Sequence, residues 1–391
     1  MKLRKKIALG LVLTMGLTMF AGCGGNDAQQ DAEQTGGDAA AAIKVGGTGP
    51  LTGGASIYGL AVQRGAEIAV EEVNALGGVQ FELKMEDDAH DAEKAVNAYN
   101  ALKDWGMQLS LNSVTTTPGI ATSELNNEDR IFGLTPSASG TKVTEGKDNV
   151  FQMCFADPNQ GSASAKYISE QQLGSKIAVI YKNDDAYSSG IYEKFKAEAN
   201  ALGLAIVSET TFTTDSQNDF SVQLQDAKNA GADLLFLPMY YDAASLILNQ
   251  ANAMGYAPKF FGVDGMDGIL TLEGFDTSLA EGVMLLTPFS ADAEDELTKN
   301  FVAKYQDKYG EVPNQFAADA YDCIYALHQA CTAAGATADM SAEELNDLMV
   351  EQFTTMTFDG LTGTGATWSA DGQITKDPKG MVIQNGAYVG M

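Results

Sequence analysis

The chain has 391 residues, with 52 Asp or Glu against 24 Lys or Arg, which gives a formal net charge of −28. Such an acidic balance disfavours nucleic acid and anionic lipid head groups as partners, because both repel a negative surface. The 4 cysteines and 2 histidines, His90 and His328, are too few for a disulfide framework or a histidine-based metal site. We expect neither a metal nor another cofactor.

Residues 1–22 are predicted to be a signal peptide. Basic residues fill most of positions 2–6, an apolar stretch follows over 7–20, and Phe20-Ala21-Gly22-Cys23 has the small residues before cysteine that are typical of a bacterial lipoprotein. We expect cleavage before Cys23, lipid attachment to Cys23, and an extracytoplasmic protein anchored at the membrane's outer face. The alternative is an ordinary secretory signal in which Cys23 has no role.

Residues 23–42 are predicted to be a flexible linker. Beyond Cys23 the segment consists of Gly, Ala, Gln, Thr, Asn and Asp or Glu, with no large apolar side chain. A stretch of this composition cannot bury enough apolar surface to fold, so we expect it to tether a folded part to the membrane.

The folded part is expected to begin at Ile43 and to contain two domains, because about 350 residues exceed what one core usually supports. The strand patterns predict strands at Ile43–Val45, Phe81–Met85, Gln108–Leu111, Arg130–Leu134, Lys176–Tyr181, Ala205–Val207, Leu234–Pro238, Lys259–Val263 and Val283–Leu286. Helical spacing predicts helices at 62–73, Glu93–Lys103, Ile120–Asn126, Asn159–Gln172, Gly190–Ala201, Ser216–Asn229, Ala243–Ala253, Glu294–Tyr309 and Gln315–Ala334. Hairpin turns are expected at Ala370-Asp371-Gly372 and Gln384-Asn385-Gly386.

Alternating strands and helices predict an α/β fold with parallel sheets. The alternation breaks at Asn149–Asp157, where we expect the chain to cross to a second sheet, with Asp157 capping the next helix. A return crossing is expected near Leu286–Phe289. The sequence therefore predicts two doubly wound lobes, 43–157 with 288–365 and 158–287 with 366–391, that close like a hinge around a ligand.

Hydroxyl-rich turns follow two neighbouring predicted strands. Thr115–Thr117 precede Pro118 at a helix start, where Thr117 is expected to cap, and Thr135–Ser139 follow the next strand. Adjacent parallel strands place both turns at one sheet edge, and a helix N-terminus there favours a carboxylate. Ordinary helix starts have the same composition, so spacing alone leaves this open.

Asp264 follows a strand of the second predicted lobe. It is placed to face a ligand's ammonium group, although a solvated turn aspartate fits the spacing equally well. Tyr187, Tyr240 and Tyr241 follow two further strands, which suggests the wall of a cleft.

Several motifs together resemble the type I periplasmic binding proteins of branched-chain amino-acid ABC transporters, the leucine/isoleucine/valine-binding protein family. The resemblance runs from Ile43 to about Tyr388. It rests on Ile43–Val79, Asp87-Asp88 with Asp91, Leu134–Ser139, Asp157–Gly161, Ile177–Ile180, Phe261–Gly265 and Phe316–Tyr321.

The resemblance implies the type I periplasmic binding protein fold, two Rossmann-like lobes joined by a multi-stranded hinge. It also implies a ligand site at Tyr58, Thr116, Ser137, Ala138, Ser139, Tyr187, Tyr240, Asp264 and Phe316. The hydroxyl and main-chain groups of Thr116 and Ser137–Ser139 would hold the α-carboxylate of an amino acid, Asp264 would pair with its ammonium, and the aromatic residues would wall the pocket. Relatives often carry Glu in place of Asp264, and a disulfide near His90 and the Thr115 loop that this chain lacks.

We expect a monomeric extracytoplasmic lipoprotein that binds a small amino acid, branched-chain or related, and delivers it to an ABC transporter permease. An NAD site is disfavoured, since the pattern starting at Gly47 has Thr52 where G-x-G-x-x-G needs glycine. A serine enzyme is disfavoured too, because S-x-x-K at Ser139–Lys142 has neither K-T-G nor S-D-N. A sensor for a chemoreceptor or sensor kinase, and a short amide or aromatic carboxylate as ligand, remain alternatives.

Overall fold

The computed structural model describes residues 41–376 and 378–391. The predicted signal peptide, Cys23 and all but the end of the predicted linker lie outside these residues, so the lipid anchor stays a prediction. Within the described part of the chain, no helix is long and apolar enough to cross a membrane.

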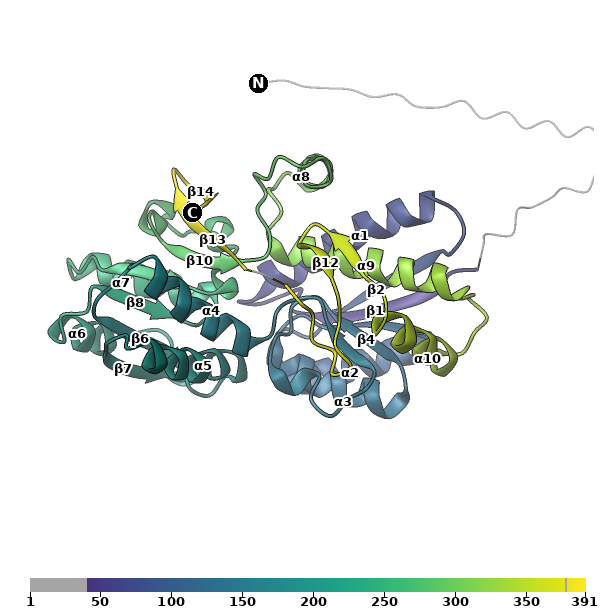
Figure 1. Cartoon of the computed structure of the whole chain (residues 1–391), viewed down its shortest axis with the longest axis horizontal. Coiled ribbons are helices and arrows are strands. Elements are labelled where there is room, and N and C mark those ends of the chain that lie inside the picture. Colours follow the sequence, from purple (N-terminus) through teal and green to yellow (C-terminus); the bar gives the residue numbers. More distant parts are fainter. Residues whose placement is uncertain (1–40, 377) are drawn as a thin grey trace, which may run out of the picture. The chain divides into compact units, whose positions relative to one another are not determined.

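The first sheet is wholly parallel, with strand order β2-β1-β3-β4-β5. Its strands are β1 (Ile43–Gly49), β2 (Phe81–Asp87), β3 (Leu109–Ser113), β4 (Phe132–Thr135) and β5 (Val150–Gln152). Around it lie α1 (Ser56–Ala75), α2 (Ala92–Trp105), α3 (Thr116–Asp129), α9 (Gln315–Ala334) and α10 (Ala342–Phe353), as Figure 1 shows. Helices α1 and α9 pack closely where Gly65 faces the main chain of Ala317, which leaves no room for a side chain at position 65.

The second sheet has strand order β14-β13-β10-β9-β8-β6-β7. Its strands are β6 (Ile177–Lys182), β7 (Ile206–Phe212), β8 (Leu234–Leu237), β9 (Lys259–Gly262), β10 (Met284–Thr287), β13 (Lys379–Gln384) and β14 (Ala387–Gly390), of which β13 pairs antiparallel with both its neighbours. Helices α4 (Asp157–Glu170), α5 (Ala186–Leu202), α6 (Ser221–Asn229) and α7 (Tyr241–Ala253) surround it in Figure 1.

Shorter elements complete the chain. They are α8 (Glu296–Tyr309), the two-stranded sheet of β11 (Phe358–Gly360) and β12 (Gly363–Ala366), and the 3-10 turns η1 (Thr141–Val143), η2 (Thr214–Ser216), η3 (Asp264–Met266), η4 (Ile269–Thr271) and η5 (Thr277–Ala280). The chain passes from the first sheet to the second between β5 and α4. It leaves the second sheet after β10 and rejoins it at β13.

The predicted α/β fold with parallel sheets is confirmed, and each predicted strand and helix is present with its ends shifted by a few residues. Two predictions are wrong. Thr117 and Asp157 do not cap: α3 begins at Thr116, after Thr115, and α4 begins at Asp157, after Ala156. Helix α10 was not predicted, although Ser341 and Glu344 form a capping box at its start.

The predicted lobe boundaries stay a prediction, and the hydrogen bonds of residues 368–373 bear on them. The indole Nε1 of Trp368 donates to the main-chain carbonyl of Gln152 at 2.8 Å. The main-chain amide of Gln152 donates to the carbonyl of Gly372 at 2.9 Å. This part of the C-terminal segment is therefore bonded to β5 of the first sheet, whereas β13 and β14 belong to the second. The turn at Asn385-Gly386 has positive φ at both residues, as a tight hairpin requires.

A buried ion pair ties the C-terminal segment to α9. The Lys376 ammonium lies 2.8 Å from an Asp319 carboxylate oxygen, and the two side chains are 1% and 2% exposed. A charge this deeply buried is costly to leave alone, so each partner depends on the other.

We predict that Lys376→Met lowers the free energy of unfolding by about 3–5 kcal/mol, because Asp319 is left buried without its counter-charge. Adding Asp319→Leu to this variant should recover most of the loss. Lys299→Met, which removes an exposed pair with Glu294, is the control and should cost under about 1 kcal/mol. Urea unfolding measures all three variants, and a Lys376→Met protein as stable as the wild type would contradict the expectation.

Candidate functional site

The candidate site lies where strands of both sheets end. Thr115 follows β3 and Ser137 follows β4 in the first sheet. In the second sheet, Tyr187 follows β6, Tyr240 follows β8 and Asp264 follows β9. Ligand sites in parallel α/β sheets form at this edge, because all the strands present their carboxyl ends there.

A small cavity brings six of the predicted site residues together. It is lined by Tyr58, Val114, Thr115, Ser137, Tyr187, Tyr240, Asp264, Gly265 and Phe316. Its free volume is about 10 Å³, close to the room one water molecule needs. The walls therefore nearly touch in this arrangement.

Thr116, Ala138 and Ser139 do not line this cavity, although all three are buried. The Thr116 hydroxyl accepts a hydrogen bond from the Gly140 amide at 3.3 Å, and the Ala138 amide donates to the Thr135 hydroxyl at 2.9 Å. Ser137 lines the cavity while its hydroxyl donates to the Val114 carbonyl at 2.6 Å. These bonds fix the two hydroxyl-rich turns against each other at the sheet edge.

Tyr58 of α1 joins the two sides of the site. Its hydroxyl donates to the carbonyl of Gly265 and accepts from the amide of Tyr241 at 3.2 Å. Its ring contacts those of Tyr240, Tyr241 and Phe316, with centroids 4.6–5.5 Å apart. A residue from the first-sheet side is thus bonded directly to residues that follow β8 and β9.

Asp264 is the charged group at the centre of the site. The Tyr187 hydroxyl donates to its carboxylate at 2.5 Å, and the Gly265 amide donates to the Tyr187 hydroxyl at 2.9 Å. Burial raises the pKa of Asp264 to about 7, against the opposing effect of the hydrogen bond from Tyr187. Within residues 41–376 and 378–391, no basic side chain forms an ion pair with it.

Two further polar residues beside Asp264 were not predicted as site residues. Both carboxylate oxygens of Asp157, and the amide nitrogen of Gln160, are buried without a hydrogen-bond partner in the described chain. The Gln160 side-chain oxygen instead accepts from the Asp264 amide at 3.4 Å. Burial raises the pKa of Asp157 well above its usual range, and the nearby Asp264 charge adds to the effect. Their place in Asp157–Gly161, just after the crossing between sheets, was the available sequence signal.

A larger polar cavity of about 350 Å³ adjoins the first and shares Tyr58 and Tyr240 with it. The Tyr240 ring stacks on Tyr187, with centroids 4.6 Å apart and planes within 7°, so it forms a wall common to both cavities. His90 stands edge-on to Tyr240, and its Nδ1 is 2.8 Å from the Thr115 hydroxyl. This hydrogen bond links the two segments near which relatives often carry a disulfide. The cysteines of the described chain, Cys154, Cys323 and Cys331, are free and buried.

Comparison with known proteins identifies the family. The family model described as "Periplasmic binding protein" matches residues 42–387. The chain belongs to the periplasmic binding protein family. It is thus a substrate-binding protein, of a family that consists of binding proteins rather than enzymes and works outside the cytoplasm.

Individual relatives agree with this assignment. Leu/Ile/Val-binding protein homolog 3 of Brucella melitensis is 30% identical over 308 residues, which cover 77% of this chain and 81% of the relative. The leucine-binding protein LivK of Thermotoga maritima is 26% identical with a TM-score of 0.80, covering 89% of this chain and 97% of its own. LivJ of Streptococcus pneumoniae, solved with isoleucine, is 27% identical with a TM-score of 0.79, covering 90% and 100%. The predicted family and its two-lobed α/β fold are confirmed.

We predict that Asp264→Asn stabilises the ligand-free protein at pH 8. Between its unfolded value of 3.8 and about 7, native Asp264 holds a proton that the unfolded chain has released, so stability falls as pH rises through this window. An asparagine keeps the hydrogen bond from Tyr187 and avoids this loss, which is worth roughly 2–4 kcal/mol. Thermal unfolding at pH 4 and pH 8 should show the gain at pH 8 alone.

Asp233→Asn is the matched control. Hydrogen bonds from Ser175 and the Lys176 amide outweigh the effect of burial and lower the pKa of Asp233, so its charged form stabilises the fold at neutral pH. This substitution should therefore lower the melting temperature at pH 8. A common direction of change in both variants would contradict the role assigned to burial at Asp264.

Proposed function

We propose that this protein captures a small amino acid, branched-chain or related, between its two lobes and delivers it to an ABC transporter permease. In the proposal it is a lipoprotein held at the outer face of the cell membrane through Cys23. The observation that carries the ligand class is the buried Asp264 carboxylate, which has no positive partner among residues 41–376 and 378–391 and lines the small cavity together with Ser137 and Thr115.

The proposed binding scheme follows from the cost of removing a zwitterion from water. Asp264 supplies the counter-charge for the α-ammonium. The hydroxyl of Thr115 and the N-terminal end of α3 supply dipoles for the α-carboxylate, while Ser137, whose hydroxyl donates to the Val114 carbonyl, positions the neighbouring turn. Each hydrogen bond to a charged group contributes roughly 1.5–3 kcal/mol, so a few of them suffice for tight binding.

Aromatic rings give the proposed site its preference for an apolar side chain. Tyr58, Tyr240 and Phe316 present ring faces and edges to the cavity, and they offer few hydrogen-bond partners to a polar side chain. The relatives named above are leucine- or isoleucine-binding proteins by their names, which supports the branched-chain class.

Ligand entry in this proposal requires the site to open. The small cavity holds about one water, while the adjoining cavity of about 350 Å³ has the size of a small-molecule site. The Tyr240 ring lies between the two cavities, and the Tyr187 hydroxyl is hydrogen-bonded to the carboxylate of Asp264. We infer that opening of the lobes moves these two rings and lets the ammonium take the place of the Tyr187 hydroxyl.

Mass spectrometry tests the ligand class directly. We expect the full-length protein, purified and then denatured, to release an aliphatic amino acid that rebinds the refolded protein one-to-one. Release of a short amide or an aromatic carboxylate, without saturable binding of any amino acid, would contradict the proposed class.

Transport and sensing make different predictions for cells. If the protein delivers its ligand to a permease, removing it should abolish high-affinity uptake of the labelled amino acid, and Cys23→Ala should reduce uptake by releasing the protein from the membrane. Uptake that is unchanged in cells lacking the protein, together with a lost chemotactic or transcriptional response, would favour the sensor.

A further inference from the structure

A third cavity, of about 520 Å³, lies apart from the two cavities of the candidate site and shares no lining residue with them. Its apolar walls include Ile57, Leu60, Leu270, Phe289, Val302 and Tyr388. Its volume is within the range of sites that bind small organic molecules. Apolar walls of this size favour a ligand with a hydrophobic body.

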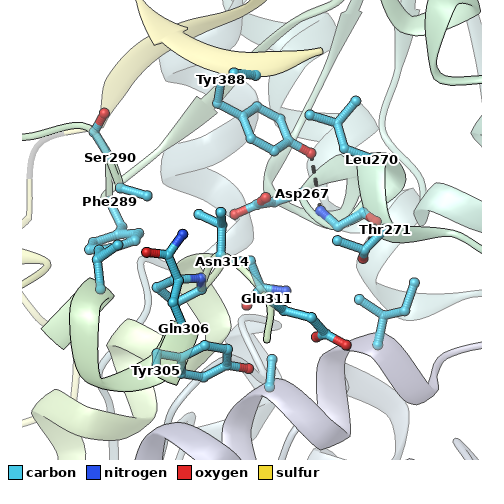
Figure 2. Close-up of a pocket in the computed structure, with 18 of the residues that line it drawn as sticks. Asp267, Leu270, Thr271, Phe289, Ser290, Tyr305, Gln306, Glu311, Asn314 and Tyr388 are labelled. Carbon is cyan, nitrogen blue, oxygen red and sulfur yellow. Dashed lines mark hydrogen bonds between the residues drawn. The ribbon is translucent and has the colours of Figure 1, made fainter. Parts of the chain in front are cut away.

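Asp267 places an unpartnered charge in this cavity. Figure 2 shows its carboxylate directed into the space between Tyr388 and Asn314. One oxygen accepts from the amide of Gln315 at 2.9 Å, while the other is buried with no hydrogen-bond partner in the described chain. The Asp267 side chain lines the cavity although the residue is only 6% exposed.

The nearby hydroxyl of Tyr388 is already engaged. It accepts from the Gly268 amide at 3.1 Å, the dashed contact in Figure 2, and it also lies 3.4 Å from the Met266 carbonyl. Burial raises the pKa of Asp267 to about 6. A buried carboxylate with few donors favours a ligand that brings one.

The other charges around the cavity point to a cation. Asp292 and Glu311 also line it, and Arg64 is the basic lining residue. The Arg64 guanidinium lies 2.7 Å from a Glu311 carboxylate oxygen and 5.1 Å from the centre of the Tyr309 ring. Since Arg64 is satisfied by Glu311, Asp267 keeps its charge uncompensated, and a ligand carboxylate would be repelled.

We propose that this cavity is a second binding site, for a small organic amine with an apolar body and no carboxylate, whose ammonium pairs with the Asp267 carboxylate. The apolar body lies among Leu270, Phe289 and Tyr388. This ligand differs from the amino acid proposed for the cleft, which needs a carboxylate site. The proposal therefore stands or falls independently of the cleft's function.

The two ends of the cavity wall belong to different parts of the fold. Ile57 and Leu60 are on α1, which packs against α9 beside the first sheet, while Tyr388 is on β14 of the second. Asp267 also lies three residues after Asp264, and Gln315 bonds both: its amide to the Asp267 carboxylate, its side chain to the Asp264 carbonyl at 3.0 Å. An amine bound here thus contacts elements of both sheets next to the cleft.

Calorimetry with tryptamine tests the proposal, and tryptophol, with the same indole body and a hydroxyl in place of the amine, is the matched probe. We expect wild-type protein to bind tryptamine one-to-one, and tryptophol about tenfold or more weakly, because the neutral hydroxyl lacks the charge that Asp267 attracts. Asp267→Asn should weaken tryptamine about tenfold or more and remove the difference between the two probes.

Two further variants separate this cavity from the cleft. Ala291→Trp fills the cavity of about 520 Å³ and should abolish tryptamine binding without changing the binding of L-isoleucine. Asp242→Asn, in the adjoining polar cavity of the cleft, should leave tryptamine binding unchanged. No binding of tryptamine to the wild type, or binding that survives Ala291→Trp and is lost in Asp242→Asn, would overturn the proposal. A circular dichroism spectrum and a melting temperature that match those of the wild type show that Ala291→Trp is folded.

Discussion

The site depends on one electrostatic constraint: a carboxylate, Asp264, is buried at the end of β9 without a positive partner in the described chain. Removing a carboxylate from water costs several kcal/mol, and the protein meets this cost only in part, with a hydrogen bond from the Tyr187 hydroxyl, which the Gly265 amide supports in turn. The remaining cost appears as the raised pKa of Asp264. In the proposed function, a ligand ammonium would supply the missing counter-charge, so ligand binding would offset this cost.

The fold produces this situation because two parallel sheets present their carboxyl ends to the same space. Neither set of loops contains a complete site: the hydroxyl groups at Thr115 and Ser137 follow strands of the first sheet, and Asp264 follows a strand of the second. The Tyr58 hydroxyl donates a hydrogen bond to the Gly265 carbonyl, which holds the loops of the first sheet against those of the second. In the proposed function, a zwitterion placed in the small cavity would have Asp264 on one side and the turns of Thr115 and Ser137 on the other.

Much of this was predictable from sequence, because strand–helix alternation fixes which residues follow strand ends, and Asp264, Tyr187 and Tyr240 all do. The detail within a turn was not predictable. Ser139 is buried but does not line the small cavity, because the turn after β4 is held by hydrogen bonds to Thr116 of α3 and Asp157 of α4, which are distant in sequence. The buried Asp157, whose carboxylate has no hydrogen-bond partner in the described chain, was missed for the same reason, since burial depends on residues distant in sequence.

Titration calorimetry of L-isoleucine into the wild type and Asp264→Asn at pH 8 tests the central claim most directly. The account predicts saturable one-to-one binding to the wild type and a loss of about 2–5 kcal/mol of binding free energy in the variant, whose fold is retained. Equal affinity in the two proteins would contradict the claim that Asp264 holds the ligand's ammonium group.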